Sequence, residues 1–340
     1  MEVEPLIRKL PKAEQHVHIV GSTRPETLLW LVEKGGLDKP FKTLMDVQNF
    51  FRYTSFRHFI NVYSTVVDCI TDEDQFERIT YEMLESDAQC NVQYVEASFS
   101  ALDHVVRGLD YGKMLDAINR GINRARMEFG IECNVRVDLV RNYGPEKGME
   151  VLDWIESKSD NIVSIDLGGS EERFPAKPYK SVYQRARKMG LHLVAHAGEA
   201  AGPDSIWQAV TELEVEHVGH AVAAIHEPKL MEHIKKRNIT IEACPTSNVR
   251  TQVVSAIKNH PIRVFHNLGL AVTVNTDDPS MFETDMNDEF LQLYHKLGFS
   301  LHELFNLSLN AVNSSFLSKE SKSKMRKSFM KTFDRILDQE

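Results

Sequence analysis

The sequence predicts an α/β fold, a (β/α)₈ TIM barrel, and three observations lead to this prediction. The chain has 340 residues, a length that suits one such barrel with insertions. Eight short apolar stretches rich in β-branched residues have the pattern of strands. The longer segments between them carry helical patterns, and repeated strand–helix alternation is typical of this barrel. Because no internal repeat or low-complexity linker interrupts the pattern, we expect a single domain over residues 1–340.

Each expected strand is followed by a turn or by a helical segment. The segment 204–213 opens with an aspartate suited to a helix N-cap, and 226–238 ends in basic residues suited to a helix C-terminus. Two amphipathic patterns, 300–316 and 321–337, follow the last strand and are expected to close the barrel. The eight expected strands cover residues 13–20, 92–99, 133–140, 162–168, 192–198, 215–222, 240–247 and 271–277.

The connection between the first two strands is unusually long. About 70 residues separate them, far more than one crossover helix needs. The stretch 50–70 is aromatic-rich and has a helical pattern. It indicates an extra helical layer, a lid over the carboxyl end of the barrel, or both. Phe56, Phe59 and Ile60 lie at helical spacing there and are candidates to cap the site.

Composition excludes several classes of function. The net charge is −9 and its acidic excess is dispersed, so we expect no nucleic-acid or membrane partner. The four cysteines form no C-x-x-C pair, which argues against a zinc knuckle and a redox motif, and so few cysteines in a chain of this length argue against a disulfide framework. The charged N-terminal segment lacks the apolar core of a secretory signal, so a cytoplasmic location is expected. The sequence does not indicate an oligomeric state.

Chemically reactive residues recur where the expected strands end. His16 and His18 are two apart in a strand and therefore project to the same face. On its own this pair is weak evidence, but the carboxyl ends of barrel strands converge at one mouth. Three imidazoles and one carboxylate suit zinc with an open position for water, and the sequence therefore predicts one metal site. The other residues at these strand ends are Gly168, Gly169, His196, Glu199, His220, Asp277 and Asp278.

Six motifs carry a family resemblance. They are LPKAEQHVHIVGS with RPETL, SIDLGGSE, HAGEAAGPDSIW, VGHAVA, CPTSN and VTVNTDDP, and they span residues 10 to about 285. In this order they resemble the adenosine deaminase family of zinc aminohydrolases. The resemblance implies one zinc ion per chain, a small purine substrate, and hydrolytic removal of the 6-amino group with release of ammonia.

The resemblance also implies roles for individual residues. His16, His18, His196 and Asp277 match the family's zinc ligands. Glu199 matches the proton donor to the purine, and His220 matches the base that orients the attacking water. Asp278 and Gly169 match the residues that contact the purine ring.

Several positions depart from the family pattern. Val20 stands where an acidic residue usually binds the ribose hydroxyls, and we expect it to face the sugar side of the site. Ser170 replaces a common aspartate, and Ala97 with Ser98 replaces a frequent arginine. These differences leave the substrate open, and a 5′-modified adenosine becomes as plausible as adenosine itself.

Alternative substrates and functions remain at this point. Other family members act on aminodeoxyfutalosine, whose 5′ side is an extended aromatic acid, on adenine, or on N6-methyl-AMP. A catalytically inactive barrel is disfavoured because every expected ligand and acid–base residue is present. A two-metal cyclic amidohydrolase is disfavoured because the fourth expected strand carries no lysine.

Overall fold

The computed structural model describes residues 3–338 and confirms the predicted barrel. Eight parallel strands follow one another around a single sheet in the order β1 to β8. The bounds of β1 to β5 agree closely with the expected ones, whereas β6, β7 and β8 are shorter than expected. The expected domain limits include residues 1, 2, 339 and 340, which lie outside the described part. The strands are β1 Lys12–His18, β2 Val92–Phe99, β3 Glu132–Val140, β4 Ile162–Gly168, β5 His192–Ala197, β6 His217–His220, β7 Thr240–Ala243 and β8 Val272–Val274.

The barrel closes through the segment that follows β8 rather than through β8 itself. The Asp277 N–H donates to the His16 carbonyl at 3.0 Å, and the His18 N–H donates to the Asp277 carbonyl at 2.8 Å. Asp277 adopts a positive φ of 67° to make this bridge. The same bonds that join the last strand to the first therefore bring the Asp277 side chain beside both histidines of β1.

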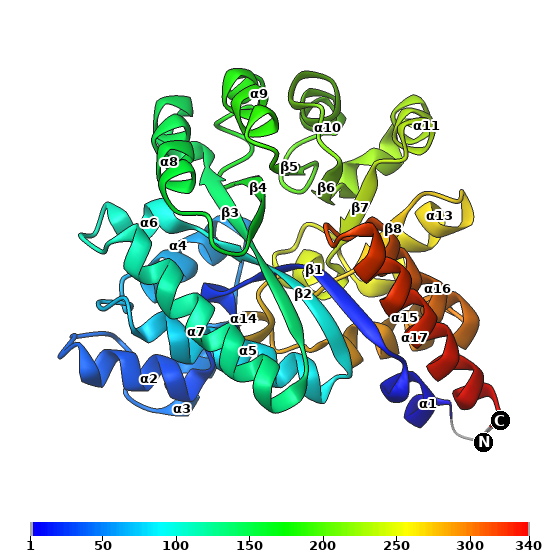
Figure 1. Ribbon diagram of the computed structural model, residues 1–340, viewed down its shortest axis with the longest axis horizontal. Coiled ribbons are helices and arrows are strands. Elements are labelled where there is room, and N and C mark those ends of the chain that lie inside the picture. The colour runs from blue at the N-terminus through cyan, green and yellow to red at the C-terminus, as the bar shows by residue number, and fades with distance from the viewer. Residues whose placement is uncertain (1–2, 339–340) are drawn as a thin grey trace.

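Helices surround the strands, as Figure 1 shows. The expected helix at 204–213 begins as α10 and continues as a π-helical turn, Ala209–Leu213. The expected helix at 226–238 is α11, and the two expected C-terminal helices are α16 and α17. The helices between and after the strands are α6 Ala101–Val105, α7 Tyr111–Phe129, α8 Pro145–Ser157, α9 Lys180–Lys188, α10 Pro203–Gln208, α11 Pro228–Arg237, α12 Pro245–Arg250, α13 Ile262–Asn267, α14 Pro279–Phe282, α15 Met286–Leu297, α16 Leu301–Ser314 and α17 Lys319–Leu337. A short helix, α1 Glu4–Lys9, precedes β1.

The long first connection forms a helical layer on one side of the barrel (Figure 1). The helical pattern expected over 50–70 divides in two, because α3 ends at Phe50 and α4 begins at Phe56. The Ser55 side chain accepts a hydrogen bond from the His58 N–H and so caps the start of α4. The insertion contains α2 Pro25–Lys34, α3 Leu44–Phe50, α4 Phe56–Val67 and α5 Gln75–Gln89.

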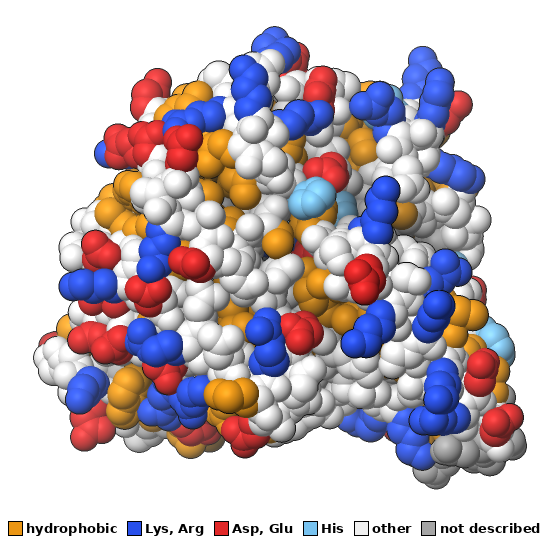
Figure 2. Space-filling view, viewed as in Figure 1, with side chains coloured by type: hydrophobic (Ala, Val, Ile, Leu, Met, Phe, Trp, Pro, Cys, Tyr) orange, Lys and Arg blue, Asp and Glu red, His pale blue; other side chains and the backbone are white. Residues whose placement is uncertain are grey.

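The surface matches the dispersed charge of the sequence. Lys and Arg side chains alternate with Asp and Glu side chains over the face in Figure 2, and neither sign gathers into a broad patch there. None of the helices within residues 3–338 combines the length and the apolar character needed to cross a membrane.

Candidate active site

A cavity of about 220 Å³ opens at the carboxyl ends of the strands. Its floor contains His18, His196, His220 and Asp277. The three histidines lie at the carboxyl ends of β1, β5 and β6, and Asp277 lies in the loop after β8. One wall comes from the helical insertion, and another comes from the glycine pair that ends β4. The barrel topology thus collects in one place the residues that the sequence places far apart.

Four side chains at this floor form a compact cluster. His16, His18, His196 and Asp277 each offer a ligand atom, and all four atoms lie within 4.8 Å of one another. Asp277 Oδ1 lies 3.3 Å from His16 Nε2 and 3.2 Å from His18 Nε2. Three imidazoles and one carboxylate are the donor set that zinc prefers, and the arrangement fits one metal ion.

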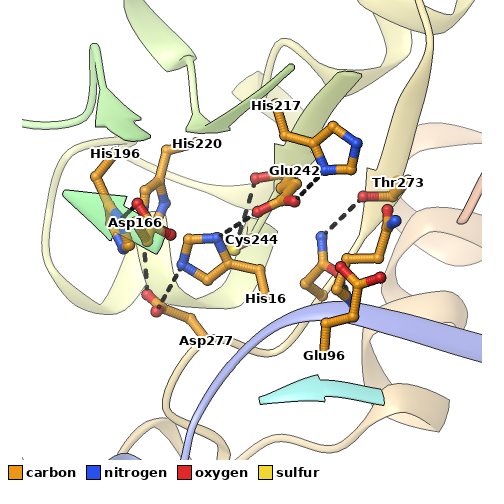
Figure 3. Close-up of polar contacts among 12 residues, drawn as sticks. His16, Glu96, Asp166, His196, His217, His220, Glu242, Cys244, Thr273 and Asp277 are labelled. Carbon is orange, nitrogen blue, oxygen red and sulfur yellow. Dashed lines mark hydrogen bonds and ion pairs between the residues drawn. The ribbon is translucent and has the colours of Figure 1, made fainter. Parts of the chain in front are cut away.

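Each of the three histidines has a carboxylate behind it. In Figure 3, His16 lies between Asp277 and Glu242, and its Nδ1 is 3.0 Å from Glu242 Oε2. His196 Nδ1 is 3.0 Å from Asp166, and His18 Nδ1 is 3.3 Å from Asp138. Such partners fix the ring orientation and tautomer of a metal-binding histidine and raise its basicity. The sequence motifs predict no role for these three carboxylates, although Asp166 lies within the SIDLGGSE motif.

The electrostatics of the cluster favour a bound cation. Burial by itself lowers the pKa of His16, yet its bonds to Asp277 and Glu242 raise that pKa to about 10. Burial by itself raises the pKa of Asp277, but the bonds from His16 and His18 hold that pKa well below its usual value. The carboxylates therefore create a buried negative field at the point where the four ligand atoms meet.

His220 lies beside the cluster and differs from the other three histidines. Its Nδ1 is 3.1 Å from Asn248 Nδ2, and its Nε2 is 3.6 Å from Glu199 Oε2. The contact with Asn248 orients the ring so that Nε2 faces Glu199 and Asp277 on the cavity floor. Burial lowers the pKa of His220 well below its usual value. A neutral imidazole at this position can exchange protons with a group on the cavity floor.

Glu199 faces His220 across the cavity floor. Its side chain is only 8% exposed. Burial, followed by the negative charges of Asp277 and Glu171, raises the pKa of Glu199 well above its usual value. This shift favours the protonated form that a proton donor requires.

Glu171 fixes the loop that carries Glu199, a role that the sequence motifs do not predict. Its carboxylate accepts four backbone N–H groups, those of Gly198, Glu199, Ala200 and Ala201, and the last three bonds measure 3.1, 2.8 and 3.0 Å. Glu171 closes the SIDLGGSE motif, but nothing in the sequence spacing shows that it bonds this loop. It positions the proton donor without reaching the cavity.

We expect Glu171→Gln to lower kcat by about tenfold or more, because a hydrogen bond to a charged group is worth about 1.5–3 kcal/mol and four bonds lose the charge they share. Zinc content and KM should change little, since neither the metal cluster nor the cavity wall is altered. Steady-state kinetics and metal analysis of the variant test this. The neighbouring exposed Glu172→Gln is the matched control. Equal kcat in the two variants would contradict the positioning role.

Two further predicted contacts line the cavity. The Asp278 carboxyl is buried, its Oδ1 has no hydrogen-bond partner among residues 3–338, and it lies against Gly21, where a Cβ atom would clash with it. Burial and the adjacent Asp277 raise the pKa of Asp278 well above its usual value. Gly169 has a φ of 95°, and a Cβ there would come within 2.7 Å of Asn142 Oδ1. Glycine therefore keeps the backbone open to the cavity at this point.

The structure corrects one of the predicted wall residues. Phe56, Phe59 and Ile60 line the cavity as expected. Val20 does not: it lies in the turn after β1, is 2% exposed, and packs into the hydrophobic core. The chain turns into a 3₁₀ helix at Val20, so the alternation of a strand no longer sets the direction of its side chain.

Comparison with known proteins decides the family. The family model described as adenosine deaminase matches residues 11–332, which is most of the chain. The chain belongs to the adenosine deaminase family. Its fold and membership make it an aminohydrolase, as the resemblance of the sequence motifs implied.

Individual relatives and solved structures are similar to this chain over most of its length. An aminodeoxyfutalosine deaminase of Streptomyces coelicolor is 35% identical over 327 residues, covering 95% of this chain and 84% of the relative. The structure of an adenine deaminase from Arthrobacter aurescens superposes with a TM-score of 0.92 at 28% identity, covering 95% and 98%. An amidohydrolase from Burkholderia ambifaria, with a TM-score of 0.91 at 25% identity over 99% and 94%, contains bound zinc.

Proposed function

We propose that this member of the adenosine deaminase family hydrolyses a 6-aminopurine nucleoside with an enlarged 5′ substituent to its 6-oxo product and ammonia. The observation that carries the proposal is the position of Glu199 and His220 beside the four-residue cluster on the cavity floor. His16, His18, His196 and Asp277 would hold one zinc ion. When bound, zinc acts as a Lewis acid that makes water reactive at neutral pH.

The chain's own residues supply the proton transfers. His220 is neutral and close to the cluster, so it can take a proton from the attacking water. Attack at carbon 6 of the purine places negative charge on the ring unless N1 is protonated. Glu199, whose protonated form is favoured by burial and by its negative neighbours, can donate that proton to N1.

The remaining contacts orient the base. N7 of the purine is an acceptor, so Asp278 must hold a proton to bond it, and its raised pKa favours that form. The backbone N–H of Gly169, a residue that lines the cavity, can donate to N3. These contacts would hold carbon 6 over the cluster and so reduce the entropy cost of the reaction.

The cavity wall supports an enlarged 5′ group. Phe56, Phe59, Ile60 and Tyr63 form an apolar surface, which accepts a bulky substituent better than a free hydroxyl group. Val20 is buried in the core and supplies no acidic group to the ribose. Among the named relatives, aminodeoxyfutalosine deaminases of two Streptomyces species are 35% and 34% identical to the chain. Aminodeoxyfutalosine is therefore the first substrate to test.

The test is ammonia release from a panel of purines by the zinc-loaded protein. The panel contains aminodeoxyfutalosine, 5′-deoxyadenosine, a 5′-thioether of adenosine, adenosine, adenine and N6-methyl-AMP, since relatives carry the last three names as well. We expect kcat/KM for the best 5′-modified nucleoside to equal or exceed that for adenosine. A hundredfold preference for adenosine or adenine would contradict the enlarged 5′ pocket. Removal of the metal with a chelator should abolish turnover, and added zinc should restore it.

A further inference from the structure

One cation lines the cavity near the C-terminal end of α4. Among the described residues that line it, Arg107 is the sole lysine or arginine. Asp278, which would contact the purine, lines the same cavity and acts on Tyr63 in the middle of α4. Phe59 of α4 packs against Phe282, four residues after Asp278, with ring centroids 5.0 Å apart. Arg107 instead bonds Asp68, the residue that follows α4.

The wall that α4 provides is mainly apolar. Phe56, Ile60, Tyr63 and Val67 line the cavity from successive turns of α4. Asp68, which directly follows α4, bonds Arg107, so this wall leads toward the arginine. A ligand whose base contacts Asp278 would extend its 5′ substituent along the wall toward a positive charge.

The guanidinium of Arg107 is held in place. Its Nε donates to Asp68 Oδ1 at 2.6 Å, and its Nη1 donates to the Asp103 carbonyl at 2.5 Å. These bonds use two of its five N–H groups, and the arginine side chain is still 31% exposed. A fixed guanidinium loses little further entropy when it binds a planar anion.

Two neighbouring acids, Asp68 and Asp103, offset part of this charge, and each also has another partner. Asp68 is shared between Arg107 and Lys39, whose Nζ lies 3.9 Å from its carboxylate. The Asp103 carboxyl accepts a hydrogen bond from the Tyr143 hydroxyl at 3.0 Å, so its oxygen is directed to that phenol. The aromatic ring of Tyr143 also lines the cavity here.

We propose that the Arg107 end of the cavity is a subsite for an anionic group, a carboxylate or a phosphate, carried at the end of the 5′ substituent. This proposal rests on the proposed function and narrows its substrate class to 5′-extended, anionic 6-aminopurine nucleosides. The apolar wall would bind the spacer between the ribose and the anion.

The test compares Arg107→Gln with the wild type on matched substrates. They are aminodeoxyfutalosine with its free carboxylate, the same compound as a neutral carboxamide, AMP with its 5′-phosphate, and 5′-deoxyadenosine without either. We expect the wild type to favour the carboxylate over the carboxamide by tenfold or more in kcat/KM, chiefly through KM. Arg107→Gln should remove that preference and leave 5′-deoxyadenosine unchanged. If the phosphate of AMP is the natural anion, the arginine effect will be larger on AMP than on the carboxylate.

Two further variants separate binding from structural support. Asp68→Asn frees Arg107 from its ion pair and should preserve or strengthen the preference for the anion. Arg120→Gln removes an arginine of α7 that pairs with Asp74 and Glu77 outside the cavity, and it should have no effect. Equal losses on all substrates in Arg107→Gln, or a wild type indifferent to the carboxylate, would overturn the subsite.

Equilibrium binding keeps the test independent of turnover. If the wild type deaminates none of these compounds, the proposed function fails. Calorimetric titration of the carboxylate and the carboxamide into the zinc-loaded wild type and Arg107→Gln then decides the subsite by itself. Tighter binding of the carboxylate to the wild type alone supports it, and equal binding to both proteins overturns it.

Discussion

Replacement of His16 by alanine is expected to remove both zinc and activity. His16 lies at the centre of the cluster: Asp277 contacts one nitrogen of its ring, and Glu242 contacts the other. Removing a partner behind a metal ligand typically costs 10–100-fold in metal affinity, and loss of the ligand itself should cost more. Metal analysis of the purified variant and its rate of ammonia release measure the effect.

A histidine outside the cluster provides the control. His192 begins β5 and pairs with Glu216 near the opposite end of the barrel, so His192→Ala should retain zinc and activity. Circular dichroism distinguishes loss of the metal from loss of the fold. We expect His16→Ala to keep its fold, because Glu242 retains its buried partners Arg136 and His217. A His16→Ala protein with full zinc and normal turnover would show that the histidine pair of β1 is structural.

Replacement of Glu199 by glutamine should lower kcat by 10² or more while zinc content stays intact. General acid catalysis contributes about 10²–10⁴-fold, and an amide at this position cannot give a proton to N1 of the purine. The metal cluster should be unaffected, since Glu199 is not among its four ligands. The measurements are kcat, KM and zinc per chain.

The result for Glu199→Gln is interpreted beside that for Glu171→Gln. Glu199 lies in the loop after β5, and Glu171 holds that loop in place through hydrogen bonds. Only Glu199 can deliver a proton to the purine. We therefore expect a larger fall in kcat for Glu199→Gln. Loss of zinc from that variant, or turnover close to that of the wild type, would exclude the proton-donor role.

Local patterns account for most of the fold that the sequence predicted. Strands β2 and β4 have the expected bounds because a buried parallel strand is a short apolar run with few alternatives. The pattern over 50–70 was misread as continuous, since the bend at residues 51–55 carries no proline or glycine to mark it. Ser55 marks the start of α4 only once its bond to the His58 N–H is seen.

The candidate site, like the fold, was predictable from the sequence only in part. His16, His18, His196 and Asp277 could be proposed from sequence because their motifs resemble those of the family, and a parallel barrel brings the carboxyl ends of its strands together. Their roles as ligands stay predictions until the metal is measured. The direction of Val20 could not be predicted, because it depends on where β1 ends and the 3₁₀ turn begins.

The sequence by itself determined the barrel, the family and the chemically reactive residues at the strand ends, because these depend on residue type and on spacing along the chain. Only the tertiary structure decided the partners of those residues. The carboxylates Asp138, Asp166 and Glu242 contact their histidines from other strands. Glu171 bonds a loop 27 to 30 residues away, and Arg107 bonds Asp68, which follows α4. Such contacts join segments whose separation in sequence carries no periodic signal, and they form only when the strands close into a barrel.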